Sequence, residues 1–234
     1  VAGIEGLLDN KNILYVQGTA QFADKYTVRV ARARYADGRS ADIEYRAKKI
    51  IIATGSVTKC PPIPGNHLKG VITSTEMLDL TAVPKRLCII GGGVIGLEFA
   101  SIFNAFGSEV TVLEFCKEIL PNFDADIAKR LKVSLKSQGI NVINNAAVNA
   151  ITANGALYDV SYELKGVKQS VLADIVLTAV GRAANTASLN LADVGIEFDR
   201  CGIKTDNDLQ TNIEGIYAVG DINGKCQLAH AASF

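Results

Sequence analysis

The amino-acid sequence predicts an α/β fold in three layers, in which a parallel sheet lies between amphipathic helices and a β-meander. Four short segments predict the strands of the parallel sheet, and the apolar runs in the first and last of them indicate burial in the sheet: residues 87–90, 109–114, 141–143 and 174–180. Two segments between them repeat apolar residues at helical spacing: 94–106 and 123–138. Three further strands are separated by Asn-Gly and Lys-Gly turns: 148–152, 157–164 and 167–172.

The composition argues against several classes of protein. The 234 residues include 24 basic and 24 acidic side chains, so nothing points to a nucleic-acid partner or an anionic membrane surface. No apolar run approaches the length of a membrane span. The five cysteines are scattered without a C-x-x-C or C-x-x-x-x-C pair and predict reduced thiols in a cytoplasmic protein. Only two histidines are present, which leaves little for a metal site.

The strongest motif lies between the strand at 87–90 and the helix after it. Its glycines Gly91, Gly93 and Gly96 occupy the positions of G-x-G-x-x-G. Gly91 permits the tight turn out of the strand, Gly93 lets a pyrophosphate approach the backbone, and Gly96 lets the helix lie close to the sheet. The free N–H groups at the helix start would receive the phosphate charge. Strand, glycine loop, helix and second strand therefore predict a Rossmann-like, dinucleotide-binding βαβ unit.

A carboxylate at the end of the second strand completes this unit. Glu114 stands 18 residues after Gly96, where an acid can accept a hydrogen bond from a ribose 2′-hydroxyl and would repel a 2′-phosphate. The next residues are Phe115, Cys116 and Lys117, which offer no arginine pair for such a phosphate. The sequence therefore favours NAD over NADP.

The helices are expected to bury definite apolar faces on the sheet. The face of the helix after the glycine loop comprises Ile95, Phe99, Ile102, Phe103 and Phe106. The next helix, capped at Asp124 and stopped at Gly139, buries Ile127, Leu131 and Leu135. A short third helix, ending at Leu80, is predicted from the capping box at residues 73–76.

The flanking segments predict part of a second sheet. Residues 1–9 have the pattern of a helix end and 13–18 that of a strand, and two alternating segments joined at Asp37-Gly38 predict an antiparallel meander: 26–31 and 43–47. Buried strands at 50–54 and 216–219 have no parallel partner within their own segments.

We therefore expect these two strands to pair in one sheet that the dinucleotide-binding domain interrupts. The predicted domains are residues 1–59 with 189–234, and an inserted domain at 60–188.

Four ordered motifs resemble those of the flavin-dependent pyridine nucleotide–disulfide oxidoreductases, and most closely of their dihydrolipoamide dehydrogenase branch. They are IIATGS at 51–56, GGGVIGLE at 91–98, AVGR at 179–182 and LQTNIEGIYAVGD at 209–221. The similarity runs through the whole sequence. It implies that the inserted domain binds NAD and that the flanking segments belong to a partial FAD-binding domain.

The resemblance implies site residues on both domains. Those implied for NAD are Gly91, Gly92, Gly93, Val94, Ile95, Gly96, Glu98, Glu114, Val148 and Gly181. Those implied for FAD are Ala20, Thr54, Gly55, Ser56, Asp221, Gln227, Leu228, Ala229 and His230. Glu98 is expected to be a buried helix acid that reaches the nicotinamide and the flavin; the alternative is a solvated helix carboxylate.

The resemblance also implies that the chain is a central part of a longer enzyme. The family's redox C-x-x-x-x-C, its upstream glycine motif and its downstream histidine–glutamate pair have no counterpart in this sequence. No catalytic residue and no metal site is therefore assigned.

The intact protein is expected to be a homodimeric oxidoreductase that transfers electrons between a dithiol, either a small molecule or a lipoyl domain, and NAD. The chain alone is expected to bind NAD without turnover. The alternatives are a non-catalytic dinucleotide-binding module, or a relative with another acceptor such as a glutathione, mercuric or peroxide reductase.

Overall fold

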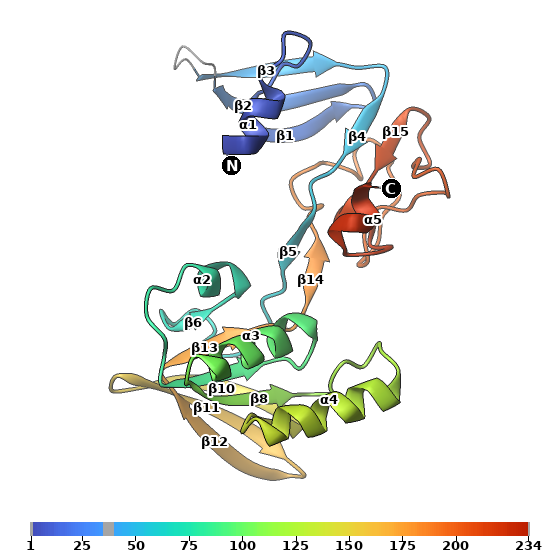
Figure 1. The fold of residues 1–234 in the computed structure, drawn as a ribbon. Helices are drawn as coiled ribbons and strands as arrows, with labels where there is room; N and C mark the ends of the chain where they lie inside the picture. Colours follow the sequence, from blue (N-terminus) through green and yellow to red (C-terminus); the bar gives the residue numbers. More distant parts are fainter. Residues whose placement is uncertain (1, 35–39, 234) are drawn as a thin grey trace. The chain divides into compact units, whose positions relative to one another are not determined.

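The computed structural model describes residues 2–34 and 40–233 (Figure 1). The chain divides into two compact units. One is continuous and spans Thr58–Arg182; the other is discontinuous and combines Val1–Val57 with Ala183–Phe234. Residues 183–188, expected in the inserted domain, therefore lie in the discontinuous unit. The expected turn at Asp37-Gly38 lies outside the described residues.

The continuous unit is built on a five-stranded parallel sheet of order β6-β13-β7-β8-β9. Its strands are β6 (Val71–Ile72), β7 (Arg86–Ile90), β8 (Glu109–Glu114), β9 (Asn141–Asn144) and β13 (Ile175–Thr178). The helices are α2 (Ser74–Leu78), α3 (Val94–Ala105) and α4 (Ala125–Ser137). An antiparallel meander follows β9: β10 (Ala146–Asn154), β11 (Leu157–Leu164) and β12 (Val167–Ala173).

Alternate residues of the central strand face two different cores, which confirms the three layers. Leu87 and Ile89 of β7 pack with the helices, whereas Cys88 and Ile90 pack with the meander. All four are at most 5% exposed. A strand that is buried on both faces explains why its sequence reads as a continuous apolar run.

The helix faces were predicted only in part. α3 buries Leu97, Phe99, Ala100 and Phe103, whereas Ile102 and Phe106 are 46% and 64% exposed. The face turned to the sheet is centred on Gly96, because this glycine lets the helix axis approach the strands closely. In α4 the small Ala128 takes the inward position, and Ile127 is exposed. α2 has the predicted capping box but ends at Leu78 rather than Leu80.

The discontinuous unit contains an antiparallel meander and a parallel strand pair. The meander comprises β1 (Gln17–Asp24), β2 (Thr27–Arg34) and β3 (Ser40–Arg46) and is preceded by α1 (Ala2–Leu8). The parallel pair is β4 (Ile50–Ile52) with β15 (Ile216–Ala218). Two short strands pair where the chain passes between the units: β5 (Ser56–Thr58) and β14 (Arg182–Ala184). The chain continues through the 3₁₀ helix η1 (Gly220–Asn223) to α5 (Ala229–Ser233).

Two expectations for this unit were wrong. The strand predicted at 13–18 begins only at Gln17, because the β1–β2 pairing starts at Gln17 opposite Arg34, and Ile13 and Leu14 are exposed. The β4 strand is covered on one face only: Ile52 is 4% exposed, but Ile51 is 67% exposed.

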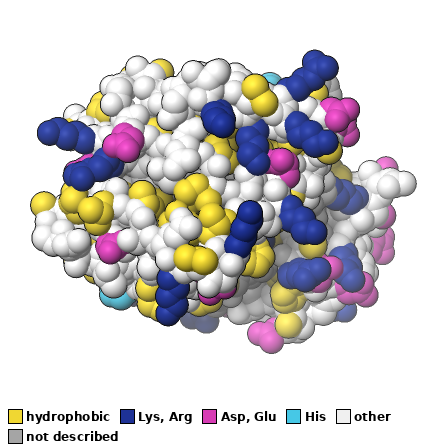
Figure 2. Space-filling view, turned by 90° about the horizontal axis from the view of Figure 1, so that it is seen from below, with side chains coloured by type: hydrophobic (Ala, Val, Ile, Leu, Met, Phe, Trp, Pro, Cys, Tyr) yellow, Lys and Arg dark blue, Asp and Glu magenta, His cyan; other side chains and the backbone are white. Residues whose placement is uncertain are grey.

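The surface carries side chains of both charges. Basic, acidic and apolar side chains are interspersed on the face drawn in Figure 2, in keeping with equal numbers of acidic and basic residues. No helix within residues 2–34 and 40–233 is long and apolar enough to cross a membrane.

Candidate dinucleotide-binding site

Two glycines of the loop between β7 and α3 lie in close contact with backbone atoms. Gly91 has a φ of +115°, and a Cβ there would lie 2.4 Å from the carbonyl oxygen of Ala179. A Cβ on Gly96 would lie 2.1 Å from the carbonyl oxygen of Gly91. Neither position can accept a side chain without backbone movement, so these two glycines shape the loop and seat α3 against the sheet.

Gly93 has different surroundings from Gly91 and Gly96. It is the N-cap of α3 with an extended backbone (φ −80°, ψ −177°), and a Cβ there would meet no atom within 4 Å. No side chain caps this helix end. The first N–H groups of α3, at Val94, Ile95 and Gly96, therefore have neither an intrahelical acceptor nor a side-chain cap. The open space beside these uncapped N–H groups is suited to a pyrophosphate, whose oxygens can accept their hydrogen bonds.

Glu114, at the carboxyl end of β8, is held by the backbone on both oxygens. Oε2 accepts a hydrogen bond from Gly92 N, and Oε1 accepts one from Cys116 N at 2.7 Å. The residue is only 7% exposed. Each carboxylate oxygen has a second lone pair, so the group can still accept a hydroxyl hydrogen bond at its exposed rim. These residues therefore fit the ribose of a dinucleotide.

The Cys116 thiol also belongs to this arrangement. A hydrogen bond from the thiol to the Glu114 carboxylate, together with burial and the carboxylate's charge, raises the pKa of Cys116. No motif in the sequence connects these two side chains.

The loop after β8 is tied back to the glycine loop, which the sequence did not predict. Leu120 N donates to Gly92 O at 3.0 Å, and Leu120 has a φ of +50°. A Cβ on Gly92 would lie 3.0 Å from both Glu114 Oε2 and Ile119 Cγ2. Gly92 thus uses both backbone polar groups to join the two loops.

Val148 and Gly181 lie on segments that meet this region. Asn145 N donates to Cys116 O at 3.0 Å, which fixes the start of β10 beside the loop after Glu114. Val148 follows on β10, half-buried at a β-bulge. Gly181 follows β13, whose carboxyl end is at the same edge of the sheet, and has a φ of +106°.

Glu98 is not the buried acid that was expected. It is exposed on α3, and its expected contact with a nicotinamide and a flavin stays a prediction. The side chain therefore needs no buried partner within its own unit to offset a cost of desolvation.

The residues expected along a flavin meet in part in the discontinuous unit. Ser56 Oγ donates to Asp221 Oδ2 at 2.6 Å, and Thr54 Oγ1 donates to the carbonyl oxygen of Asn185 at 3.1 Å. Asn185 N donates in turn to Gly55 O at 3.0 Å. Asn185 was not predicted, since only the fold brings it to the end of β4. A half-buried carboxylate with lone pairs beyond the Ser56 bond fits a sugar-alcohol hydroxyl.

The other residues expected for FAD take no part in these hydrogen bonds. Ala20 is exposed on β1, opposite Val30. Gln227, Leu228, Ala229 and His230 are exposed before and within the first turn of α5. α5 packs on η1, where a Cβ on Gly220 would lie 3.3 Å from Ala232 Cβ.

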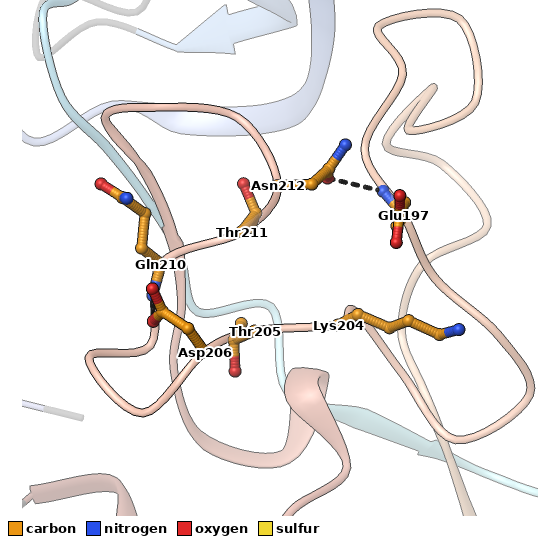
Figure 3. A pocket seen from close by; sticks show the side chains of 7 residues that line it. All are labelled: Glu197, Lys204, Thr205, Asp206, Gln210, Thr211 and Asn212. Atoms are coloured by element: carbon orange, nitrogen blue, oxygen red, sulfur yellow. Dashed lines mark hydrogen bonds between the residues drawn. The ribbon is translucent and has the colours of Figure 1, made fainter.

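A shallow polar pocket of about 230 Å³ lies elsewhere in the discontinuous unit (Figure 3). One wall is joined by a 2.9 Å hydrogen bond from Glu197 N to Asn212 Oδ1. None of the predicted site residues lines it. Within the part of the chain that the structure describes, no three His, Cys, Asp or Glu side chains are grouped so that they could hold a metal ion.

The parallel sheet, the glycine turn into α3 and the buried acid define a dinucleotide-binding α/β protein of the Rossmann type. A family model described as "Pyridine nucleotide-disulphide oxidoreductase" matches residues 1–234, and the chain belongs to that family. Members of the family are oxidoreductases that bind FAD and a pyridine nucleotide.

Similar proteins support this assignment. The dihydrolipoyl dehydrogenase of Acholeplasma laidlawii is 45% identical over 191 residues, covering 80% of this chain and 55% of the relative. That of Staphylococcus aureus is 39% identical over 234 residues, covering 99% and 48%. Among solved structures, the Cu(II) complex of the HOCl-induced flavoprotein disulfide reductase RclA from Escherichia coli is 36% identical with a TM-score of 0.88, covering 99% and 50%. The chain spans about half the length of these relatives.

Proposed function

We propose that this chain is the NAD-binding region, with part of the FAD-binding region, of an oxidoreductase that transfers electrons between a dithiol and NAD. Dihydrolipoamide, free or on a lipoyl domain, is the proposed dithiol because dihydrolipoyl dehydrogenases are 39–45% identical to the chain. The intact protein is proposed to be a homodimer, and the chain alone to bind NAD without turnover.

The Glu114 carboxylate carries the preference for NAD. It is 7% exposed and fixed by Gly92 N and Cys116 N, so it cannot swing away from the ribose. A carboxylate held in this place accepts hydrogen bonds from ribose hydroxyls but repels a 2′-phosphate. The uncapped N–H groups at the start of α3 hold the pyrophosphate.

The chain's own residues position the cofactors rather than react. A bound flavin and nicotinamide supply the hydride chemistry, and the protein supplies placement and electrostatics. Gly93 admits the pyrophosphate, Glu114 orients the adenosine ribose, and Val148 and Gly181 line the two ends of the nucleotide. On the flavin side, Asp221 accepts from the ribityl chain while Ser56 steadies its carboxylate.

Calorimetric titration of the chain with NADH and NADPH tests the role of the acid. We expect NADH to bind more tightly, and Glu114→Ala to reduce the preference about 10–100-fold, since a charge-assisted hydrogen bond contributes about 1.5–3 kcal/mol. Glu109→Ala is the matched control, because Glu109 is exposed at the opposite end of the same strand. Equal affinities for both nucleotides in the unaltered chain would contradict the proposal.

The second part of the proposal concerns turnover. The purified chain is expected to be colourless and not to oxidise dihydrolipoamide. Sustained reduction of NAD by dihydrolipoamide in the presence of this chain and FAD would contradict that expectation.

The second candidate function is that of a family member with a different electron acceptor. RclA and the leghemoglobin reductase of Glycine max are 36% and 37% identical to the chain, close to the 39% of the S. aureus enzyme. Glutathione, mercuric and peroxide reductases fall in the same class. A preference for NADPH in the titration above would favour the NADP-dependent members.

A further inference from the structure

Two exposed cysteines of the discontinuous unit, Cys201 and Cys226, lie at and just after two bends whose backbones are packed together. Ile203 N donates to Ile222 O at 2.9 Å, which joins the two chain segments. A Cβ on Gly202 would lie 2.4 Å from that same oxygen. A Cβ on Gly224 would lie 2.2 Å from Cys201 O and 3.4 Å from Cys201 Cβ. Gly224 therefore rests directly on Cys201.

Cys226 follows Gly224 by two residues, and two residues span at most about 7 Å. Both thiols are exposed and free in the structure. Hydrogen bonds also order the turn before Cys226: Lys225 N donates to Asn223 Oδ1 at 3.0 Å, and Lys225 Nζ donates to Asp206 O. A disulfide needs Cα atoms about 4.4–6.8 Å apart, and only the exposed Lys225 separates Cys226 from Gly224, the residue that rests on Cys201.

We propose that Cys201 and Cys226 form a reversible intramolecular disulfide when the protein meets a small-molecule disulfide such as oxidised glutathione. The thiolate of one cysteine attacks the glutathione disulfide, which releases one glutathione thiolate and leaves a mixed disulfide. The second cysteine attacks the protein sulfur of that mixed disulfide and releases the second glutathione. The two cysteines lose two electrons and two protons, and one glutathione disulfide becomes two thiols.

The remaining cysteines are poor competitors for this reaction. Cys88 is fully buried in the sheet, and burial raises its pKa to about 12. The neighbouring Glu114 raises the pKa of Cys116, which lowers its thiolate fraction at neutral pH. Cys60 is exposed but belongs to the continuous unit, so it serves as an internal control for thiol reactivity.

The bond would tether the start of α5. Cys226 immediately precedes Gln227–His230, so the link would join this segment to the turn at Cys201. If the proposed function is correct, the tethered segment is the one beside the flavin. The disulfide itself does not depend on that function.

Peptide mapping tests the proposal with the whole chain. The chain is equilibrated with mixtures of reduced and oxidised glutathione, alkylated and cleaved with trypsin. Cleavage after Arg200, Lys204 and Lys225 separates the peptide 201–204 (CGIK) from 226–234 (CQLAHAASF). We expect these two peptides to be joined, two hydrogens lighter than their sum, and Cys60 to carry only glutathione or the alkylating reagent.

The same equilibration in guanidinium chloride isolates the effect of the fold. In the unfolded chain only the flexible tether brings the thiols together, at an effective concentration of about 1 mM. In the folded chain, the effective concentration of the two thiols, obtained from the fraction of linked peptide, should be at least about tenfold higher. In Cys201→Ser, Cys226 should stop at the mixed disulfide. Equal linkage in folded and unfolded chains, links between molecules, or mixed disulfides alone would each overturn the proposal.

Discussion

Gly93→Ala should separate nucleotide binding from folding, because this glycine has open space around it. A methyl group there meets no atom within 4 Å, and the extended backbone at Gly93 suits alanine. The folding cost is then only the weaker N-cap of alanine, a few tenths to about 1 kcal/mol. The methyl group would, however, occupy the space in which a phosphate oxygen must lie about 2.7–3.2 Å from the helix N–H groups.

The binding loss can be estimated from those donors. One charge-assisted hydrogen bond contributes about 1.5–3 kcal/mol, so losing one of them weakens binding by about 10–100-fold. The assay is calorimetric titration with NADH, beside urea unfolding of the same sample. Gly6→Ala is the control, because Gly6 also has open space around it and lies in the other unit. Gly93→Ala with unchanged NADH affinity and unchanged stability would refute the assignment of the pyrophosphate to this helix start.

Two further predictions concern stability. Gly91→Ala should destabilise the chain by about 2–4 kcal/mol, since it adds backbone strain of about 1–3 kcal/mol to the clash with Ala179 O, and an unchanged urea midpoint would contradict this. Hydrogen bonds from Arg86 lower the pKa of Asp174, so this carboxylate should stabilise the fold fully above its unfolded pKa of about 3.9 and lose that contribution as the pH falls through the lower folded pKa. In Asp174→Asn, the free energy of unfolding measured with urea should therefore fall less steeply as the pH is lowered. An unchanged pH dependence would contradict a stabilising role for the Arg86–Asp174 pair.

The elements of the continuous unit could be predicted because their signals are local. The strands β7 and β13 have continuous apolar runs, and the glycine motif fixes the turn into α3 within six residues. Helix faces depend on how closely the helix approaches the sheet, which the sequence does not state. Ile102 and Phe106 are as apolar as Phe99 and Phe103, yet a helix seated on Gly96 turns them outward.

The discontinuous unit was harder to predict for a related reason. Ile50, Ile51 and Ile52 form an apolar run like that of β7, but the structure covers β4 on one face only, and Ile51 is exposed. An apolar run indicates that a strand can be buried on both faces, but it does not identify the elements that cover those faces. Asn185, which accepts a hydrogen bond from Thr54 at a separation of 131 residues, is likewise found only once the chain is folded.

The glycine motif and its distant acid act as one element, and the sheet register explains why. β7 and β8 are parallel neighbours with Ile90 opposite Leu113, so the residues just beyond this pair, Gly91 and Glu114, emerge side by side at the carboxyl edge. Gly92 N then reaches the Glu114 carboxylate, and Gly92 O accepts from Leu120 N. The acid is thus fixed before a nucleotide binds, which reduces the ordering cost of binding. The spacing between the glycine motif and Glu114 predicts a ribose site because α3 and β8 bring the chain back to the strand position beside β7.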